Sequence, residues 1–270
     1  MKNMDSEELK RVVKEKYSKV VLSTQSGGCS CGCTPNGGCC GTEELSSFGE
    51  SYENIEGYVA EADYGLGCGI PTQFAGINKG DRVLDLGSGA GNDCFVAASI
   101  VGADGLVTGL DFTESMIEKA RENSKKRGYI NVEFVKGDIE DMPLPSDYYN
   151  VVISNCVLNL VPDKNRAFSN IKRVLKPGGH FCVSDVVTKG DLPEELRKDA
   201  ELYAGCVAGA SEINDYLNII KAAGFTNIEI HKEVKIDLPK EIMKKYYNPA
   251  EVEAQNSDKG IFSITVTGWK

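Results

Sequence analysis

This 270-residue chain contains ten cysteines, which can take part in more kinds of chemistry than its other residues. Five of them stand within twelve positions, in the sequence CSCGCTPNGGCC at residues 29–40. Thiolates bind soft ions, form disulfides and act as nucleophiles. The cluster is therefore consistent with a metal site, a disulfide knot or part of an active site that is assembled elsewhere. The other five are spread singly along the chain: Cys68, Cys94, Cys156, Cys182 and Cys206.

The isolated cysteines fall into two groups. Cys94 and Cys182 stand in apolar runs, where free cysteine commonly packs as a small hydrophobic residue. Cys68 lies between glycines in YGLGCGIP, Cys206 lies among small residues in YAGCVAGA, and Cys156 ends an expected strand. Small neighbours leave a thiol open to approach. Any one of these three is more often a core residue, but the three together point to a shared site.

Strand and helix patterns alternate between residues 61 and 190 and must position these thiols. Strands separated by helices imply a parallel sheet with right-handed crossovers. We therefore expect an α/β protein with a doubly wound, mostly parallel seven-stranded sheet. The expected strands are 81–86, 106–111, 132–138, 150–155, 180–187, 225–234 and 261–269, and the expected helices are about 5–20, 92–101, 113–126, 164–175 and 211–223.

Local signals set several of these boundaries. Asn92 and Thr113 are candidate N-caps, and Pro177-Gly178-Gly179 is expected to end the helix that begins at Lys164. The chain divides into three parts: an N-terminal helix with the Cys/Gly-rich segment (1–60), the alternating region (61–190), and a C-terminal portion that completes the sheet (191–270).

A glycine loop follows the first expected strand, in the sequence LDLGSGAG. Gly87, Gly89 and Gly91 have the spacing G-x-G-x-G, not the G-x-G-x-x-G of dinucleotide-binding folds. Asp93 stands in the first turn of the next helix, where a carboxylate disfavours a bound pyrophosphate. The loop therefore favours a ligand without a pyrophosphate.

Two further carboxylates end neighbouring strands. Asp111 ends the second strand and can accept hydrogen bonds from both hydroxyls of a ribose, while Asp138 ends the third and can accept from an adenine amino group. Together they fit S-adenosylmethionine, with Asp85 and the glycine turn at its amino-acid end. The alternative is that the glycines only turn the chain and the aspartates only cap helices.

The motifs DLGSGAG, GLDFTESM, GDIEDMPLP and LKPGG together resemble class I S-adenosylmethionine-dependent methyltransferases. The resemblance implies a Rossmann-like fold with S-adenosylmethionine as the cofactor. The cofactor-binding residues that it implies are Asp85, Gly87, Gly89, Gly91, Asp111, Phe112, Met116, Asp138, Ile139 and Asn155.

The methyl acceptor has to be inferred from what the chain lacks. Its two histidines, His180 and His231, stand away from the cofactor motifs, and no Cys/His or Ser/His/Asp arrangement is evident. An acceptor with a free lone pair needs no general base. Three thiolates suit a soft, thiophilic element. Trivalent arsenic fits because it takes three sulfur ligands in a pyramid and keeps a lone pair opposite them.

A narrower resemblance follows from GLGCGIPT, LDLGSGAGNDCF, VVISNCVLNLVPDK, KRVLKPGG and YAGCVAGA, which in this order are similar to arsenite methyltransferases over about residues 55–235. It implies that Cys68, Cys156 and Cys206 bind As(III), which is methylated in line by the cofactor in arsenic detoxification. Arsenite and methylarsenite are the implied substrates, with a thiol reductant of the glutathione or thioredoxin type and no permanent metal.

The family also carries a cysteine near its N-terminus that pairs with a thiol of the arsenic site. Cys39 and Cys40 are the best matches, and the choice between them is open. Cys29, Cys31 and Cys33 have no counterpart, so a flexible thiolate tract for a soft ion and a reduced, glycine-rich tail both stay open.

The composition limits the classes of partner that this protein is expected to bind. The net charge of -10 makes nucleic acid and anionic membranes poor partners, and no apolar run approaches a membrane span. The charged N-terminal segment has no apolar signal core, so we expect a cytoplasmic protein, and we expect a monomer. Two other functions stay open: a methyltransferase for a small organic acceptor, and a non-catalytic cysteine-rich protein that binds a metalloid or zinc.

Overall fold

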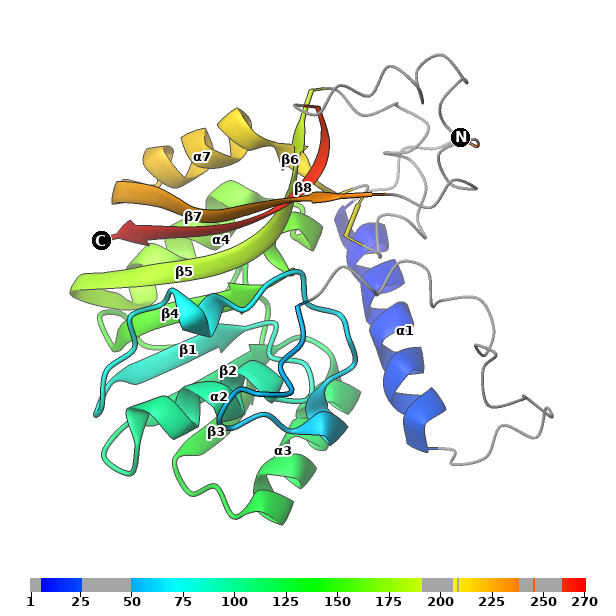
Figure 1. Ribbon diagram of the computed structural model, residues 1–270, viewed down its shortest axis with the longest axis vertical. Helices are drawn as coiled ribbons and strands as arrows, with labels where there is room; N and C mark the ends of the chain where they lie inside the picture. The colour runs from blue at the N-terminus through cyan, green and yellow to red at the C-terminus, as the bar shows by residue number, and fades with distance from the viewer. Residues whose placement is uncertain (1–5, 26–49, 191–205, 208, 238–244, 246–258) are drawn as a thin grey trace.

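The computed structural model describes residues 6–25, 50–190, 206, 207, 209–237, 245 and 259–270 (Figure 1). The N-terminal cysteine cluster, with Cys39 and Cys40, lies outside these residues. Within the part described, no helix is both long enough and apolar enough to span a membrane.

One twisted sheet runs through the centre of the molecule (Figure 1). Its strands lie in the order β3-β2-β1-β4-β5-β8-β7, and a short β6 (Ser211–Glu212) pairs with β5. The strands β1 to β5 are parallel, and β8 is antiparallel to both of its neighbours. This confirms the expected doubly wound, mostly parallel sheet, with β6 as an addition. The other strands are β1 (Arg82–Leu86), β2 (Leu106–Asp111), β3 (Val132–Lys136), β4 (Tyr149–Asn155), β5 (Leu175–Lys189), β7 (Thr226–Ile236) and β8 (Gly260–Trp269).

Helices cover both faces of this sheet. On one face, α2 (Asn92–Val101) and α3 (Glu114–Arg127) pack against β1, β2 and β3 through a cluster that includes Phe95 and Ile117. On the other face, α4 (Lys164–Val174) and α7 (Ile213–Ala222) pack through a cluster that includes Phe168 and Tyr216. The strand order reverses between β1 and β4, and in folds of this kind ligands bind at the carboxyl ends of such strands.

Two local expectations are wrong. Helix α2 is capped by Gly91, whose φ is 99°, so Asn92 is its first residue and not its N-cap. Strand β5 begins directly after α4, at Leu175, so Pro177-Gly178-Gly179 lies inside the strand. The register explains this: Tyr149 pairs with Leu175 but Val151 pairs with His180, which leaves the proline and glycines as a bulge.

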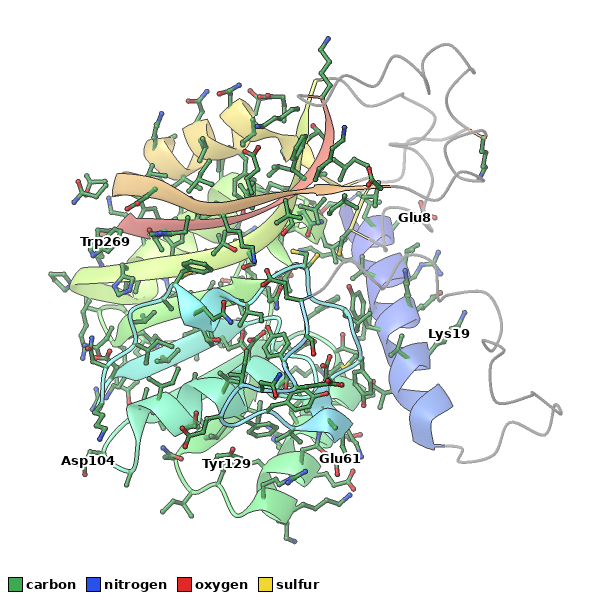
Figure 2. The ribbon with its side chains drawn as sticks, in the orientation of Figure 1. Glu8, Lys19, Glu61, Asp104, Tyr129 and Trp269 are labelled. Carbon is green, nitrogen blue, oxygen red and sulfur yellow. The ribbon has the colours of Figure 1, made fainter. Side chains whose placement is uncertain are left out.

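The N-terminal helix α1 (Ser6–Gln25) stands across the carboxyl ends of the central strands (Figure 1). It is longer than expected. Apolar side chains at helical spacing, among them Leu9, Val13 and Tyr17, face the body of the protein. Lys19 points away from it (Figure 2). The helix therefore covers the edge of the sheet at which a ligand is expected.

Candidate functional site

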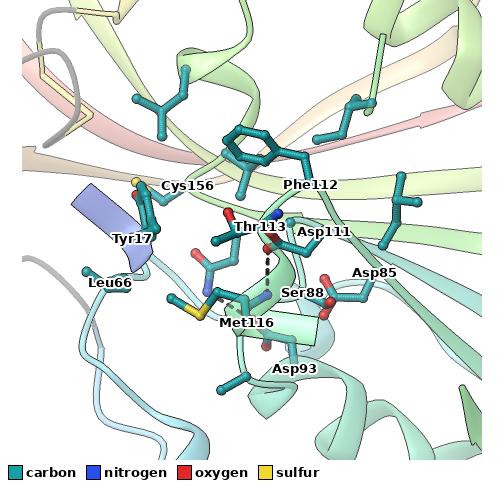
Figure 3. Close-up of a pocket in the computed structure, with 18 of the residues that line it drawn as sticks. Tyr17, Leu66, Asp85, Ser88, Asp93, Asp111, Phe112, Thr113, Met116 and Cys156 are labelled. Carbon is teal, nitrogen blue, oxygen red and sulfur yellow. Dashed lines mark hydrogen bonds between the residues drawn. The ribbon is translucent and has the colours of Figure 1, made fainter. Parts of the chain in front are cut away.

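A pocket lies at the carboxyl ends of β1, β2 and β4, and we call it the switch-point pocket (Figure 3). The loop after β1 forms its floor. Gly87 has a φ of 67°, and a Cβ there would stand 2.4 Å from Cγ2 of Val157, so only glycine fits. Of the expected cofactor residues, those that line this pocket are Asp85, Gly87, Gly89, Asp111, Phe112, Met116, Asp138, Ile139 and Asn155, whereas Gly91 does not line it.

Asp111 is held by the backbone of the loops around it. Its Oδ2 accepts from the Gly89 N–H at 3.0 Å, and its Oδ1 accepts from the Thr113 N–H at 2.8 Å. Burial raises the pKa of Asp111, and the backbone donors oppose that rise. Each carboxylate oxygen has a further lone pair, so Asp111 keeps acceptor capacity for a diol such as a ribose.

Asp138 stands two residues beyond the end of β3 and has partners that the sequence did not reveal. Its Oδ2 accepts from Lys10 of α1 at 2.7 Å, and its Oδ1 accepts from the Glu140 N–H at 2.8 Å. Lys10 also pairs with the Glu140 carboxylate at 2.5 Å. Helix α1 contributes Lys10, Val13 and Tyr17 to the pocket wall. The apolar spacing of α1 predicts a packed face but not the pocket beneath it.

A buried network closes the far end of the pocket around Asp93. Its Oδ1 accepts from the Tyr52 hydroxyl at 2.8 Å and its Oδ2 from Asn155 Nδ2 at 3.2 Å. Asn155 Nδ2 also donates to the Tyr52 oxygen at 2.8 Å. Burial raises the pKa of Asp93 to about 6. Tyr52 is a site residue that sequence reasoning missed, because it lies in a segment without a motif.

Asp85 adds a second buried carboxyl group at this end. Burial, followed by the nearby Asp93, raises its pKa well above the usual range. The Cys94 thiol donates to Asp85 Oδ2 at 3.2 Å, so Cys94 is a core residue, as expected, and also a partner of the pocket. Among the described residues, no lysine, arginine or histidine forms an ion pair with Asp85 or Asp93. Two such carboxyls favour a cationic ligand.

The pocket therefore fits S-adenosylmethionine on the chemistry of its donors and acceptors. Acceptors for an adenine amino group and a ribose diol stand at Asp138 and Asp111, and Phe112 and Met116 form apolar wall between them. Uncompensated buried carboxyls stand at the other end, where the cofactor carries its ammonium and sulfonium charges. A ligand of this charge pattern would offset the cost of burying Asp85 and Asp93.

The three cysteines singled out by the sequence lie together, and we call Cys68, Cys156 and Cys206 the thiol cluster. All three are buried free thiols in one apolar cluster. The Cys156 side chain interacts with the side chains of both other cysteines, and Cys206 Sγ also approaches the Cys156 carbonyl at 3.4 Å. Cys156 lines the switch-point pocket as well. Cys182, in contrast, lies in the core cluster that contains Phe95 and Ile117, as expected.

The thiols differ in acidity. Contacts with Cys206 and Cys68 raise the pKa of Cys156 well above the usual range, and burial raises the pKa of Cys68. The pKa of Cys206 is lowered, first by the hydrogen bond with Cys156 and with smaller contributions from Asn159 and Tyr17. The contacts among the three thiols therefore shift the pKa values of Cys156 and Cys206 in opposite directions.

The backbone of the thiol cluster is strained. Cys156 has a φ of 57° and Cys206 a φ of 75°, and they are two of only four described non-glycine residues with a positive φ. Side-chain-bearing residues adopt this conformation at an energetic cost, and such residues concentrate at functional sites.

Within the described residues, no group of three His, Cys, Asp or Glu side chains is arranged so that it could hold a metal ion. The thiols are in contact but do not form a finished ligand set.

Comparisons with known proteins agree with this geometry. A family model described as a methyltransferase domain matches residues 77–224. The arsenite methyltransferase of Halobacterium salinarum is 44% identical over 232 residues, which cover 84% of this chain and 59% of that protein. The arsenite methyltransferase of Mus musculus is 34% identical over 233 residues, with coverages of 82% and 59%.

This chain is also similar to a solved structure in both sequence and fold. The crystal structure of an arsenic(III) S-adenosylmethionine methyltransferase from Chlamydomonas reinhardtii is 37% identical, with a TM-score of 0.61 over 73% of this chain and 65% of that one. This chain spans about three fifths of the length of the two curated relatives described above. The family model covers more than half of the chain, so this protein belongs to the methyltransferase-domain family.

Proposed function

We propose that this protein transfers a methyl group from S-adenosylmethionine to trivalent arsenic held by Cys68, Cys156 and Cys206. One observation carries the proposal. Three cysteines from distant parts of the chain meet in one buried cluster, and one of them, Cys156, also lines the switch-point pocket. The names and identities of the relatives support the same substrate.

The residues of the switch-point pocket would hold the cofactor. Asp111 would accept from the ribose hydroxyls and Asp138 from the adenine amino group, with Phe112, Met116 and Ile139 as apolar walls. Asp85, Gly87, Gly89 and Asn155 would surround the amino-acid end. When bound, the cofactor supplies an electrophilic methyl group on a sulfonium sulfur.

The thiol cluster would present the acceptor. Each thiol displaces one hydroxyl group of arsenous acid: a sulfur–arsenic bond forms, an arsenic–oxygen bond breaks, and the thiol proton leaves with the hydroxyl as water. Three sulfur ligands leave arsenic with a lone pair, which needs no general base to react. Burial excludes water, and catalysis would come chiefly from placing the lone pair against the methyl group.

Turnover requires electrons as well. The methyl carbon would leave the sulfonium sulfur, which becomes a neutral thioether, and its bond to arsenic would use the lone pair and leave arsenic pentavalent. Two thiolates would return two electrons to arsenic by closing as a disulfide, and water would fill the vacated position on the trivalent arsenic. We propose that Cys39 or Cys40 takes part in this exchange and that a thiol reductant of the glutathione or thioredoxin type reopens the disulfide. In this proposal residues 1–60 supply the redox thiol, 61–190 bind the cofactor and 191–270 complete the arsenic site, in a cytoplasmic monomer.

The test is direct product analysis. The protein is incubated with arsenite, S-adenosylmethionine and a thiol reductant, and arsenic species are separated and identified by mass spectrometry. We expect methylated arsenic in an amount equal to the S-adenosylhomocysteine formed. Omission of arsenite should abolish both products. Tight arsenite binding without S-adenosylhomocysteine would show a non-catalytic metalloid-binding protein and overturn the proposal.

A further inference from the structure

Two polar side chains outside the expected site approach Cys206. The Tyr17 hydroxyl stands 4.0 Å from Cys206 Sγ, although Tyr17 belongs to α1, far away in the sequence. Asn159, in the short 3-10 helix Leu158–Leu160, donates from Nδ2 to the Cys206 carbonyl at 2.6 Å, and its side chain also interacts with the thiol. Two polar side chains from different elements therefore contact Cys206.

Asn159 has an open acceptor. The residue is fully buried, and its Oδ1 has no hydrogen-bond partner among the described residues. A buried acceptor without a partner is unfavourable, and native proteins keep few of them. A ligand with hydroxyl donors, such as arsenous acid, would supply the missing partner. The same side chain therefore offers one group to the cysteine and one to a polar ligand.

The segments that carry these groups are tied together. Lys164 Nζ donates to the carbonyls of Asn159 at 3.0 Å and Val161 at 3.1 Å, and it reaches the Gly209 carbonyl at 3.5 Å. Lys164 thus links the 3-10 helix to the turn that follows Cys206. The left-handed backbone of Cys206 is unfavourable for a residue with a side chain, and such fixed surroundings can maintain it.

Tyr17 reaches the thiol cluster from the side of the cofactor. It lines the switch-point pocket beside Cys156 (Figure 3). Tyr17 is partly buried, and the polar group that its hydroxyl approaches is the Cys206 thiol. Its position depends on α1, which Lys10 fastens to Asp138 and Glu140.

We propose that Tyr17 and Asn159 are positioning residues that hold the Cys206 sulfur ready to bond to arsenic. The inference rests on the proposed function and names residues for the capture step. As the thiol proton leaves with an arsenic hydroxyl as water, hydrogen bonds from the phenol and the amide stabilise the negative charge on sulfur. Asn159 Oδ1 accepts from a remaining hydroxyl of the arsenic.

The experiment compares Tyr17→Phe and Asn159→Leu with the unchanged protein, with sodium arsenite as the probe. Phenylalanine keeps the ring and removes only the hydroxyl. We expect the arsenite Kd and the KM for arsenite to rise on the order of tenfold or more, as for the loss of a hydrogen bond to a charged group. The Kd for S-adenosylmethionine should change much less, because Tyr17→Phe keeps the ring in the pocket wall. Tyr148→Phe is the matched control, because Tyr148 packs on Tyr149 and Arg82 outside both sites.

Arsenic K-edge X-ray absorption gives a readout that a purely structural role would not move. We expect three As–S bonds in the unchanged protein and in Tyr148→Phe, and fewer in Tyr17→Phe. Three As–S bonds and an unchanged arsenite Kd in a folded Tyr17→Phe variant would overturn the inference alone. No As–S bonds in the unchanged protein would overturn the proposed function too. If Asn159→Leu does not fold, Tyr17→Phe decides.

Discussion

The switch-point pocket and the thiol cluster adjoin each other, yet they are built on different principles. The pocket is held by hydrogen bonds from loops that directly follow strands: the Gly89 and Thr113 amides fix Asp111. The thiol cluster is held by contacts between residues far apart in sequence, with left-handed backbone at Cys156 and Cys206. The first region is set by local turns, and the second depends on the whole fold.

The largest effect should follow from Cys156→Ser, because this residue belongs to both regions. A serine hydroxyl is a poor ligand for arsenic, so we expect methyl transfer to fall at least about a hundredfold, as expected when a reacting group is misplaced. S-adenosylmethionine affinity, measured by calorimetry, should be retained. Cys182→Ser is the matched control, since Cys182 is equally buried but donates to the Pro71 carbonyl in the core. Unchanged turnover in Cys156→Ser would remove this thiol from the mechanism.

Asp111→Asn should disrupt the switch-point pocket and leave the thiol cluster unchanged. The amide keeps the shape of the side chain but loses its charge and turns one acceptor into a donor that faces a backbone N–H. We expect the S-adenosylmethionine Kd to rise roughly ten- to a hundredfold, while arsenite binding stays intact. Asp104→Asn, on an exposed turn (Figure 2), is the control. An equal loss of arsenite affinity would show that the two regions are not separable.

The contrast also explains how far the sequence could lead. Residues that end a strand, such as Asp111 and Asn155, were placed correctly because the carboxyl ends of parallel strands share one edge. Gly91 was expected in the cofactor site, but it caps α2 and does not line the pocket, because a glycine motif alone does not distinguish these two positions. The small neighbours of Cys68 and Cys206 and the strand end at Cys156 pointed to a shared site, and the family resemblance named its ligand, but no spacing rule places the three thiols together.

The residues that sequence reasoning missed all act at a distance. Tyr52, Lys10 and Tyr17 belong to segments without a motif, and each reaches its partner only through the fold. Asn159 lies in the quoted stretch VVISNCVLNLVPDK, but its polar side chain looks like any loop residue until burial is known. An asparagine in an apolar segment next to a functional cysteine is the one signal that could have raised it.

The pH dependence of S-adenosylmethionine binding should also distinguish the pocket from the thiol cluster, because Asp93 titrates in the pocket. Burial raises the pKa of Asp93 from 3.8 to about 6. Below that pH the carboxyl gains a proton and loses its attraction for a cationic ligand. We expect the S-adenosylmethionine Kd to rise by up to about tenfold for each unit of pH below this value. Calorimetric titrations between pH 5 and pH 8 would measure it, and Asp93→Asn should flatten the profile.

The same group has the opposite effect on the cofactor-free protein. Its pKa is higher in the folded than in the unfolded chain, so the folded state holds more protons between pH 4 and pH 6. The contribution of Asp93 to the free energy of unfolding is therefore fully present at the low end of this window and is lost as pH rises through about 6. If the S-adenosylmethionine Kd and the free energy of unfolding keep their full pH dependence in Asp93→Asn, that dependence belongs to another carboxyl group, such as Asp85.

The smallest expected effect tests whether α1 serves both regions. Lys10→Met removes the ion pairs with Asp138 and Glu140, and because Lys10 and Asp138 are partly exposed, the loss should be at most about 1 kcal/mol. We expect faster hydrogen exchange along α1 and a few-fold rise in the S-adenosylmethionine Kd, with a smaller change for arsenite. Lys19→Met, on the outward face of α1, is the control. Tyr17→Phe should give the reverse order, with arsenite affected first. If Lys10→Met and Tyr17→Phe lowered the affinities for S-adenosylmethionine and arsenite equally, α1 would act as one rigid cover and not through two separate contacts.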